Sequence, residues 1–374
     1  MFYLDNIKRI KPLKIAAHAC RLAMGLIFIF SGLIKAIDPW GTLIKIQEYL
    51  VIYGLDWMTP ASKGLAIWMS SAELMMGCML TFKVRIRMVS IFALTAMSIF
   101  TVVSLLSATL LPVEDCGCFG EAIRLTPWQT FFKNMCLWPM AFVIWYRYRP
   151  DKIFVFKILE ISLAATFFFS TVGLSYYCYN HLPLIDFRPY KIGVNLPEAI
   201  ETAASARAQF ETVLVCRNLK SGKIKEFALE DKQWQDDSRW EWMETRIISD
   251  EEPSVRASVS EFSLRNAYGK ECTNEIISYD EGAIDLICVT KMRDIDPECM
   301  ERLKSFIEQS LASGNRVVCL TPERLYDEDM LVAGHRVEAY NIDPSTMKTV
   351  IRAEVGVVTL KNGVIINKRN WRDL

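Results

Sequence analysis

The chain has 374 residues, of which 52% are hydrophobic and 23% charged, and its mean hydropathy is +0.18. Soluble chains of this length usually have a negative mean hydropathy, so the positive value indicates segments that lie in lipid. The 43 basic and 43 acidic side chains cancel. This balance excludes a broadly basic nucleic-acid-binding protein, and we expect no nucleic-acid partner.

The zero net charge is the sum of two unlike halves. Residues 1–180 carry 17 Lys and Arg against 10 Asp and Glu, a net charge of +7. Residues 181–374 carry 26 against 33, a net charge of −7. We therefore predict a membrane domain over residues 1–180, a linker and β-rich subdomain over residues 181–282, and a third domain over residues 283–374.

The first half contains five stretches that are long and apolar enough to cross a bilayer, for which a helix needs about 20 residues. They are Leu13–Ile34, Gly64–Phe82, Ile86–Leu111, Pro127–Tyr146 and Ile153–Tyr177. The first has a long apolar part and no small-x-small cleavage site, so we interpret it as a retained helix rather than a signal peptide. The pattern predicts a multi-pass α-helical bundle whose first partner is the lipid bilayer.

The Lys and Arg residues of this half predict its orientation. They gather before the first span (Lys8, Arg9, Lys11, Lys14), between the second and third (Lys83, Arg85, Arg87) and between the fourth and fifth (Arg147, Arg149, Lys152). Five spans place all three clusters on one side, which is the cytoplasmic side by the positive-inside rule. We expect an inner-membrane protein with its N-terminus inside and its acidic second half in the periplasm or outside.

One segment outside the spans and three ionisable residues within them need an explanation. The apolar segment Leu43–Tyr53 suits a helix at the membrane surface. Arg21 lies in the first span, Lys35 ends it, and Glu73 lies midway along the second. Ionisable groups in a membrane are costly and mark functional positions. Arg21 and Lys35 can reach the surface, so a structural role stays open for both, whereas Glu73 is short and requires a basic partner inside the bundle.

Most of the eleven cysteines are expected to be inert. Buried free cysteines behave as small hydrophobic residues, and this interpretation fits those in spans or apolar β-like runs: Cys20, Cys78, Cys136, Cys288 and Cys319. The exception is the segment Glu114-Asp115-Cys116-Gly117-Cys118-Phe119-Gly120, between the third and fourth spans. It falls on the outer side, where disulfides persist.

The Cys-Gly-Cys segment has three interpretations. Cysteines one residue apart have Cα atoms about 5.5–7 Å apart, within reach of a strained disulfide of the exchange-prone kind. Gly117 relaxes the backbone between them and Gly120 lets the chain turn back. A redox pair is favoured, but a structural disulfide or free thiols, and a metal site, stay open. Glu114 and Asp115 disfavour a thiolate, and the sequence nearby supplies no further His or Cys ligands.

These residues resemble two related families. The pattern Arg21, Gly25, Phe30-Ser31-Gly32, Lys35 and Asp38-Pro39 resembles the first helix of the DoxX family. Glu73, the segment Asp115–Gly120 and Phe132-Lys133-Asn134 resemble the MauE family, and together the likeness covers roughly residues 10–150. The MauE resemblance implies a role in maturing a periplasmic multi-disulfide enzyme subunit in methylamine utilisation. DoxX relatives include a subunit of a thiosulfate:quinone oxidoreductase, so a quinone is the candidate cofactor that the resemblance implies.

After Tyr177 the sequence turns polar, and Pro183, Pro189 and Pro197 indicate a linker. A hairpin over Thr212–Phe227 and a weak strand at Trp242–Ile248 follow. From Ala283 onward strands and helices alternate. We predict strands at Ala283–Thr290, Arg316–Thr321 and Arg336–Asn341, helices at Pro297–Leu311, Glu323–Val332 and Ser345–Glu354, and a final hairpin of Val355–Leu360 and Val364–Lys368 around Asn362-Gly363.

This order resembles the thioredoxin fold, most closely its TlpA-type branch, over residues 283–374. The family's dithiol should lie near Lys291–Cys299, where Cys299 stands alone, and its cis-proline should precede the final hairpin, where the chain has Glu354-Val355-Gly356. We therefore expect a degenerate domain without exchange activity. A lone redox role for Cys299 is the lesser alternative, since the helix N-terminus lowers a thiol pKa but Asp296 and Glu298 oppose it.

Two functions from different classes follow. In the first, Cys116 and Cys118 form the catalytic pair of a thiol-disulfide oxidoreductase component that acts on a periplasmic client or redox partner, with Asp115, Gly117, Gly120, Arg21, Lys35 and Glu73 in support. In the second, the protein is a non-catalytic assembly or docking factor whose thioredoxin-like domain binds a partner. Transport along Arg21 and Glu73 is a third. The pairing of Cys178, Cys216, Cys272 and Cys299 is left open.

Overall fold

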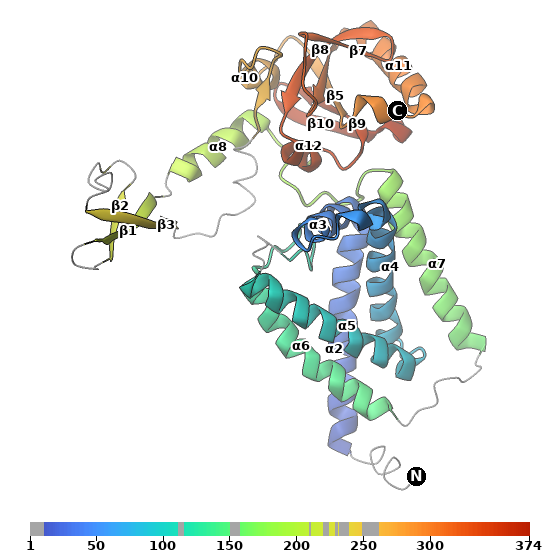
Figure 1. Ribbon diagram of the computed structural model, residues 1–374. Coiled ribbons are helices and arrows are strands. Elements are labelled where there is room, and N and C mark those ends of the chain that lie inside the picture. Colours follow the sequence, from blue (N-terminus) through green and yellow to red (C-terminus); the bar gives the residue numbers. More distant parts are fainter. Residues whose placement is uncertain are drawn as a thin grey trace. The chain divides into compact units, whose positions relative to one another are not determined.

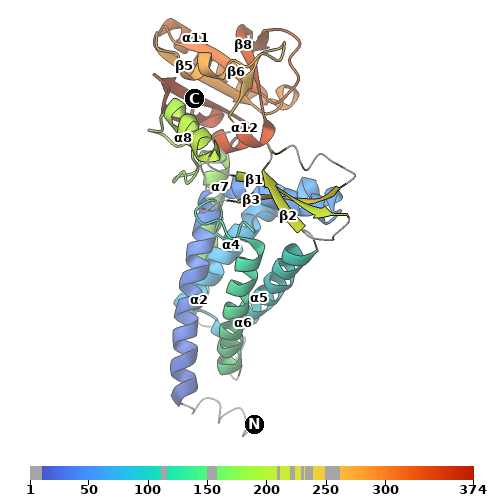
Figure 2. The ribbon, with the colours of Figure 1, turned by 90° about the vertical axis from the view of Figure 1, so that its left-hand side faces the viewer.

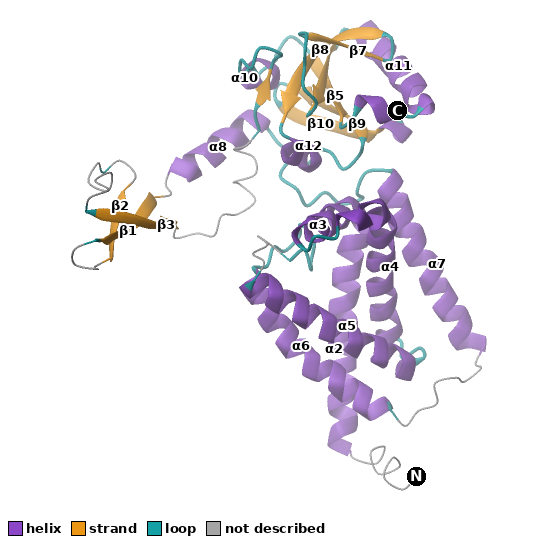
Figure 3. Ribbon diagram, viewed as in Figure 1, coloured by secondary structure: helices purple, strands orange, loops and turns teal. Residues whose placement is uncertain are grey.

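A computed structural model describes residues 11–110, 116–149, 158–208, 211–219, 224–228, 231, 239–248 and 262–374. The chain divides into two compact units, residues 1–187 and 188–374 (Figure 1). The first unit is helical and the second contains the β-sheets (Figure 3). The finer division of the second half at residue 282 stays a prediction.

The helices of the first unit match the predicted apolar stretches. They are α2 Lys11–Ile37, α3 Pro39–Ile52, α4 Ser62–Thr81, α5 Ile86–Thr109, α6 Pro127–Tyr148 and α7 Ile158–Asn180, with a 3-10 turn at Asp56–Ala61. By length and composition, four segments of the described chain can cross a membrane: Pro12–Ile37, Asp56–Thr81, Ile86–Thr109 and Ile158–Asn180. The surface segment expected at Leu43–Tyr53 is helix α3, which Asp38 caps by accepting a hydrogen bond from the Gly41 amide at 2.9 Å.

The remaining predicted span, α6, is helical but is not among those four segments. It begins at Pro127 with a capping box between Thr126 and Gln129. Lys133 and Asn134 lower its hydropathy, and Asn134 is buried, donating to Phe100 O at 3.1 Å and to Ser104 Oγ at 3.2 Å on α5. The polar face of α6 is thus turned toward α5, and α6 also packs beside α2 (Figure 2).

Three glycines allow α2 and α4 to pack closely. A Cβ added to Gly32 would lie 2.4 Å from the Leu74 amide nitrogen, and one added to Gly77 would lie 2.5 Å from the Ile29 nitrogen. At Gly25 it would lie 3.1 Å from the Thr81 nitrogen. Helices in lipid gain little from hydrophobic exclusion, so small residues that bring backbones into contact are the usual means of packing.

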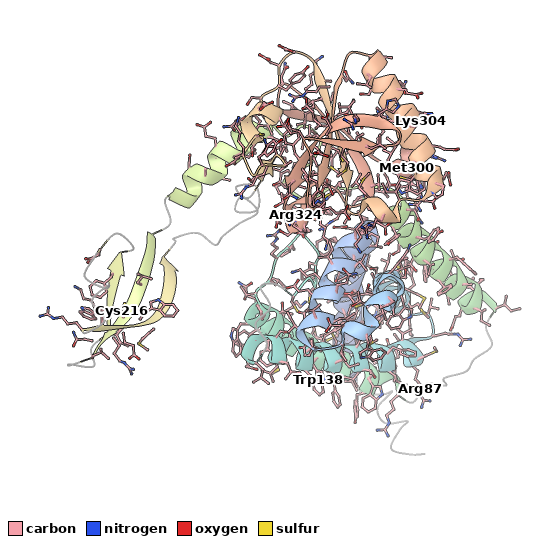
Figure 4. The ribbon with its side chains drawn as sticks, turned by 45° about the horizontal axis from the view of Figure 1, so that its top comes forward. Arg87, Trp138, Cys216, Met300, Lys304 and Arg324 are labelled. Carbon is pink, nitrogen blue, oxygen red and sulfur yellow. The ribbon has the colours of Figure 1, made fainter. Side chains whose placement is uncertain are left out.

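The outer face of the helical unit carries exposed apolar side chains, as lipid contact requires. Val102 on α5 is 57% exposed, and Phe169 on α7 is 72% exposed. Trp138 on α6, labelled in Figure 4, is partly exposed and donates its indole N–H to Ser98 Oγ at 3.0 Å. The interior core lies between the helices and includes Met24, Leu80, Met97 and Ile144.

The second unit begins with helix α8, Leu196–Ala208, and a three-stranded antiparallel sheet. Its strands are β1 Glu211–Asn218, β2 Ile224–Ala228 and β3 Trp240–Ile248, in the order β2-β1-β3. The predicted hairpin and the weak third strand are therefore present. Cys216, labelled in Figure 4, lies in β1 and is fully buried.

A seven-stranded mixed sheet forms the rest of the second unit. Its order is β10-β9-β5-β6-β8-β4, with β7 paired to β8. The strands are β4 Leu264–Arg265, β5 Ala283–Val289, β6 Arg316–Thr321, β7 Asp329–Val332, β8 His335–Ile342, β9 Val355–Lys361 and β10 Val364–Asn370, with helices α10 Thr273–Ile277, α11 Pro297–Ala312 and α12 Pro344–Val350. Strands β5, β6 and β8 are parallel neighbours, and β9 is antiparallel to β5.

Most predicted elements of this sheet are confirmed, and one is wrong. Asp296 caps α11 by accepting from the Glu298 amide at 2.9 Å, and the strands on either side occur where predicted. The helix expected at Glu323–Val332 is instead strand β7, which forms a hairpin with β8. Ala333 and Gly334 have φ of 49° and 87°, values that favour a tight turn. The side chains of Met330 and Val332 alternate into the core, a period of two that the sequence analysis mistook for a helical one.

The close α2–α4 contact predicts unequal effects of two similar substitutions. Gly32→Ala places a methyl group against the α4 backbone and should destabilise the detergent-solubilised protein by about 1–3 kcal/mol. Gly64→Ala, on α4 with no atom within 4 Å of the added Cβ, should leave the thermal midpoint unchanged or slightly higher because Ala favours helix. Equal midpoints for the two variants would contradict the packing described.

Candidate functional site

The Cys-Gly-Cys segment forms a compact turn after α5. The Cys116 amide donates to Leu125 O at 3.4 Å, and the Gly120 amide donates to Gly117 O at 3.1 Å. Gly117 and Gly120 have φ of 60° and 53°, a region that residues with a Cβ rarely adopt. Two glycines are therefore what this turn needs to hold both cysteines on one short segment.

The turn is held against helix α2 and helix α3. The Ser31 hydroxyl donates to Cys118 O at 2.6 Å, and the Phe119 ring packs on Phe30 with centroids 5.7 Å apart. A Cβ on Gly117 would lie 3.1 Å from Lys45 Cγ on α3, and one on Gly120 would lie 3.0 Å from Ile34 Cγ2 on α2. The glycines thus serve close packing as well as backbone shape.

The two thiols lie together and contact a tyrosine. All eleven cysteines are free thiols in this structure. The thiol of Cys116 hydrogen-bonds to the sulfur of Cys118, and the Tyr49 hydroxyl lies 3.5 Å from Cys116 Sγ. The hydrogen bond to Cys118, together with burial, raises the pKa of Cys116 far above its usual range.

Cys118 has the opposite electrostatic environment. The hydrogen bond from Cys116 and the positive charges of Lys133 and Lys35 lower the pKa of Cys118 to about 6, although burial opposes this change. The Lys133 ammonium group lies 4.6 Å from the centre of the Phe119 ring. Cys118 therefore loses its proton more readily than Cys116.

The expected basic partner of Glu73 is Lys35. Their Nζ and Oε2 atoms are 2.5 Å apart, and each residue is only 6% exposed. The pair joins α2 to α4 beside the cysteine turn, and both side chains line the same cavity as the two thiols.

That cavity has a volume of about 330 Å³. Its walls come from α2, α3, α4, α5, α6 and the cysteine turn, and most of the lining surface is apolar. Its polar groups are few: the two thiols, the Lys35–Glu73 pair, Lys133 and the hydroxyls of Tyr49 and Tyr53 among them. Apolar chambers with a few convergent polar groups are typical of ligand sites.

Arg21, predicted to support the site, lies elsewhere. Its guanidinium donates to Leu80 O and, at 2.6 Å, to Thr81 O, the last carbonyls of α4, where a positive charge is favourable. Fourteen residues separate it from Lys35 on one helix, which is about 21 Å. Arg21 is thus a helix cap. Asp115, also predicted as a supporting residue, lies outside the described residues.

Three residues of the site escaped the sequence analysis as site residues: Tyr49, Ser31 and Lys133. Lys133 and Ser31 were noted only as parts of family patterns, and Tyr49 only as part of a surface helix. The negative charges of Glu114 and Asp115 suggested a disfavoured thiolate, whereas the lysines from distant parts of the chain favour one at Cys118.

Burial disfavours a thiolate at three cysteines of the second unit. Burial and the carboxylate of Asp296 raise the pKa of Cys299 to about 12, which disfavours the thiolate that a lone redox role would need. Burial likewise raises the pKa of Cys288 and of Cys319 to about 12. Within the described parts of the chain, no three His, Cys, Asp or Glu side chains gather to hold a metal ion.

Comparison with known proteins gives one match, which covers part of the first unit. Residues 13–147 match the family described as methylamine utilisation protein MauE, a range that takes in both cysteines, the Lys35–Glu73 pair and Lys133. No curated protein and no solved structure matches the chain. Residues 13–147 are thus similar to the MauE family, and the apolar helices in this range are long enough to cross a membrane.

Proposed function

We propose that the protein carries out thiol-disulfide exchange through Cys116 and Cys118 during maturation of a client protein. The observation that carries the proposal is the placement of two free thiols on one turn, where they line the same cavity as Lys35 and Lys133. The lysine charges lower the pKa of Cys118, whereas that of Cys116 is raised. Cys118 attacks a disulfide of the client as the thiolate and releases one client thiol, and Cys116 then resolves the mixed disulfide, which leaves Cys116–Cys118 oxidised and the client disulfide reduced to a dithiol. A structural staple would not need this electrostatic difference.

The proposal includes five spans with the N-terminus in the cytoplasm. Four apolar segments and the polar but internally bonded α6 support the number of spans. The basic clusters at one end of the bundle support the orientation. In this arrangement the cysteine turn and the second unit are both in the periplasm, where disulfides persist.

In this proposal the second unit binds the client protein, and residues 283–374 of this unit have a thioredoxin-like fold. Parallel β5 and β6 joined by α11, with the β9–β10 hairpin on the other side of β5, support this fold. The high pKa of Cys299 argues against exchange by this unit. Docking is thus a function of one unit, and exchange a function of the other.

Trapping of a mixed disulfide tests the exchange function. When the reduced protein in detergent is mixed with a dye-labelled peptide disulfide, Cys116→Ser should accumulate a mixed disulfide on Cys118, because the resolving thiol is absent. Cys118→Ser should form little adduct, and Cys136→Ser, which removes an exposed cysteine of α6, should behave as wild type. Mass spectrometry of the labelled peptide identifies the site. Equal labelling of Cys116 and Cys118 variants would contradict the proposed roles.

The low pKa of Cys118 predicts the pH dependence of its reactivity. The rate of alkylation follows the thiolate fraction, so it should be half-maximal near pH 6, rise above it and level off by about pH 8. An ordinary thiol with a pKa of about 8.5 would still be gaining reactivity there. Short pulses of iodoacetamide followed by peptide mass spectrometry measure the profile, and a midpoint near pH 9 would contradict it.

Removing one lysine should shift that profile. Lys133→Met deletes a positive charge that stabilises the Cys118 thiolate, so the midpoint should rise by about one pH unit. Lys63→Met is the matched control, because the Lys63 ammonium group instead lies over the Tyr179 ring at 4.2 Å. Equal midpoints in the two variants would show that Lys133 does not act on Cys118.

A further inference from the structure

The cavity beside the cysteine turn has room for a side chain of the molecule that reacts with the thiols. Its volume is about 330 Å³, and Cys116 and Cys118 both line it. A cavity of about 150 Å³ is enough to hold one benzene molecule. Any disulfide that reaches Cys118 therefore brings its neighbouring atoms to the edge of a space that is large enough for an aromatic ring.

Aromatic residues in the wall favour a flat ring as the occupant. The Tyr49 and Tyr53 rings lie 6.1 Å apart at an interplanar angle of 16°, and both line the cavity together with Phe100 and Phe119. Aromatic rings pack on one another with centroids about 4.5–7 Å apart, and these contacts add to the stabilisation that burial alone provides. An aromatic side chain therefore gains more in this cavity than an aliphatic one of similar size.

One hydroxyl of the wall favours a ring that carries a hydrogen-bond acceptor. The Tyr53 hydroxyl is buried and has no hydrogen-bond partner among the described residues. The Ser31 and Tyr49 hydroxyls, in contrast, contact Cys118 O and Cys116 Sγ. A buried donor without a partner is costly, so an acceptor on the occupant lowers the free energy of the complex. The side chain of a tyrosine supplies both a ring and a phenol oxygen that accepts.

The charges of the cavity favour a neutral occupant. Lys35 is paired with Glu73 at 2.5 Å, and the Lys133 ammonium group lies 4.6 Å from the centre of the Phe119 ring. Both lysines also stabilise the thiolate form of Cys118. A charged group in the same space would disturb this balance and lose its hydration, which is costly in apolar surroundings. An uncharged phenol ring avoids both costs.

We propose that this cavity receives an aromatic side chain, best that of a tyrosine, from the residue next to the client cysteine that Cys118 attacks. The inference rests on the proposed exchange function and names the class of disulfide on which it acts. In the reaction one client S–S bond breaks and the Cys116–Cys118 bond forms. The protein dithiol gives up two electrons and two protons, and the client disulfide takes up both pairs to become a dithiol. The aromatic side chain holds the client sulfur in place during this exchange.

Four peptide disulfides provide the test. Each is a disulfide-linked dimer of one tetrapeptide, in which the residue before the cysteine is tyrosine, phenylalanine, leucine or serine. The reduced full-length protein in lipid nanodiscs is mixed with each, and mass spectrometry measures the peptide thiol released. Wild type should reduce the tyrosine peptide about tenfold or more faster than the serine peptide, because one aromatic side chain is buried. Equal rates for the four peptides would overturn the inference.

Neighbouring valines of α5 provide a matched pair of variants. Val103→Trp fills the cavity, so the ratio of the tyrosine-peptide rate to the serine-peptide rate should fall close to one. Val102→Trp alters a residue that is 57% exposed and lies outside this cavity, and it should keep the wild-type ratio. The ratio compares two peptides on one preparation, so it does not depend on the fraction of folded protein. A wild-type ratio in Val103→Trp would assign the preference to partition of the peptides into lipid and overturn the inference.

Tyr53→Phe tests the hydroxyl contact without filling the cavity. It removes a hydroxyl that makes no hydrogen bond within the described chain, so folding should be unaffected. Wild type should reduce the tyrosine peptide about fivefold faster than the phenylalanine peptide, the value of one neutral hydrogen bond. The variant should reduce these two peptides at similar rates. An unchanged fivefold preference would overturn the assignment of tyrosine as the best occupant.

The same measurements separate the two proposals. If wild type reduces all four peptides at one rate, the cavity inference fails and the proposed exchange function stands. If wild type reduces none of them, both fail.

Discussion

The ion pair between Lys35 and Glu73 is the interaction on which the site depends. Its two charges lie 2.5 Å apart among apolar helices, and each residue is 6% exposed. Either charge alone would cost several kcal/mol in such surroundings, so each residue requires the other. Gly32 on α2 meets Leu74 on α4 within one turn of this pair. Charge pairing and close backbone packing therefore specify the same register between the two helices.

The position of the cysteine turn follows from that register. Ser31 is adjacent to Gly32, and its hydroxyl holds Cys118 O. Lys35 lies one turn further along the same helix and lowers the pKa of Cys118, while Glu73 partly offsets this effect. Lys133 adds a second positive charge from α6. One helical turn of α2 thus holds the cysteine-containing loop, fixes the register of α2 against α4 and helps to lower the pKa of Cys118.

The sequence was sufficient for features that depend on local pattern or on chemical necessity. The length of the apolar stretches predicted the positions of the helices, and the spacing of glycine and cysteine predicted the cysteine turn. Because an isolated carboxylate in a membrane is costly, the sequence also predicted a basic partner for Glu73. It was not sufficient where function depends on contacts between distant segments. Ser31 and Cys118 are 87 residues apart, and no local pattern reveals that bond. Arg21 shows the converse case: of the two roles that the sequence left open for it, the hydrogen bond to Thr81 O at the end of α4 favours the structural one.

Within the proposed exchange, the hydrogen bond between the two thiols sets the order of the chemical steps. The proton stays on Cys116 chiefly because the sulfur of Cys118 accepts a hydrogen bond from it. Once Cys118 forms a mixed disulfide, its sulfur is no longer an anion and is a poor acceptor, so the main reason for the raised pKa of Cys116 disappears. Cys116 then loses its proton more readily, while Lys35 and Lys133 still favour an anion in the cavity. The first sulfur to react thereby activates the second.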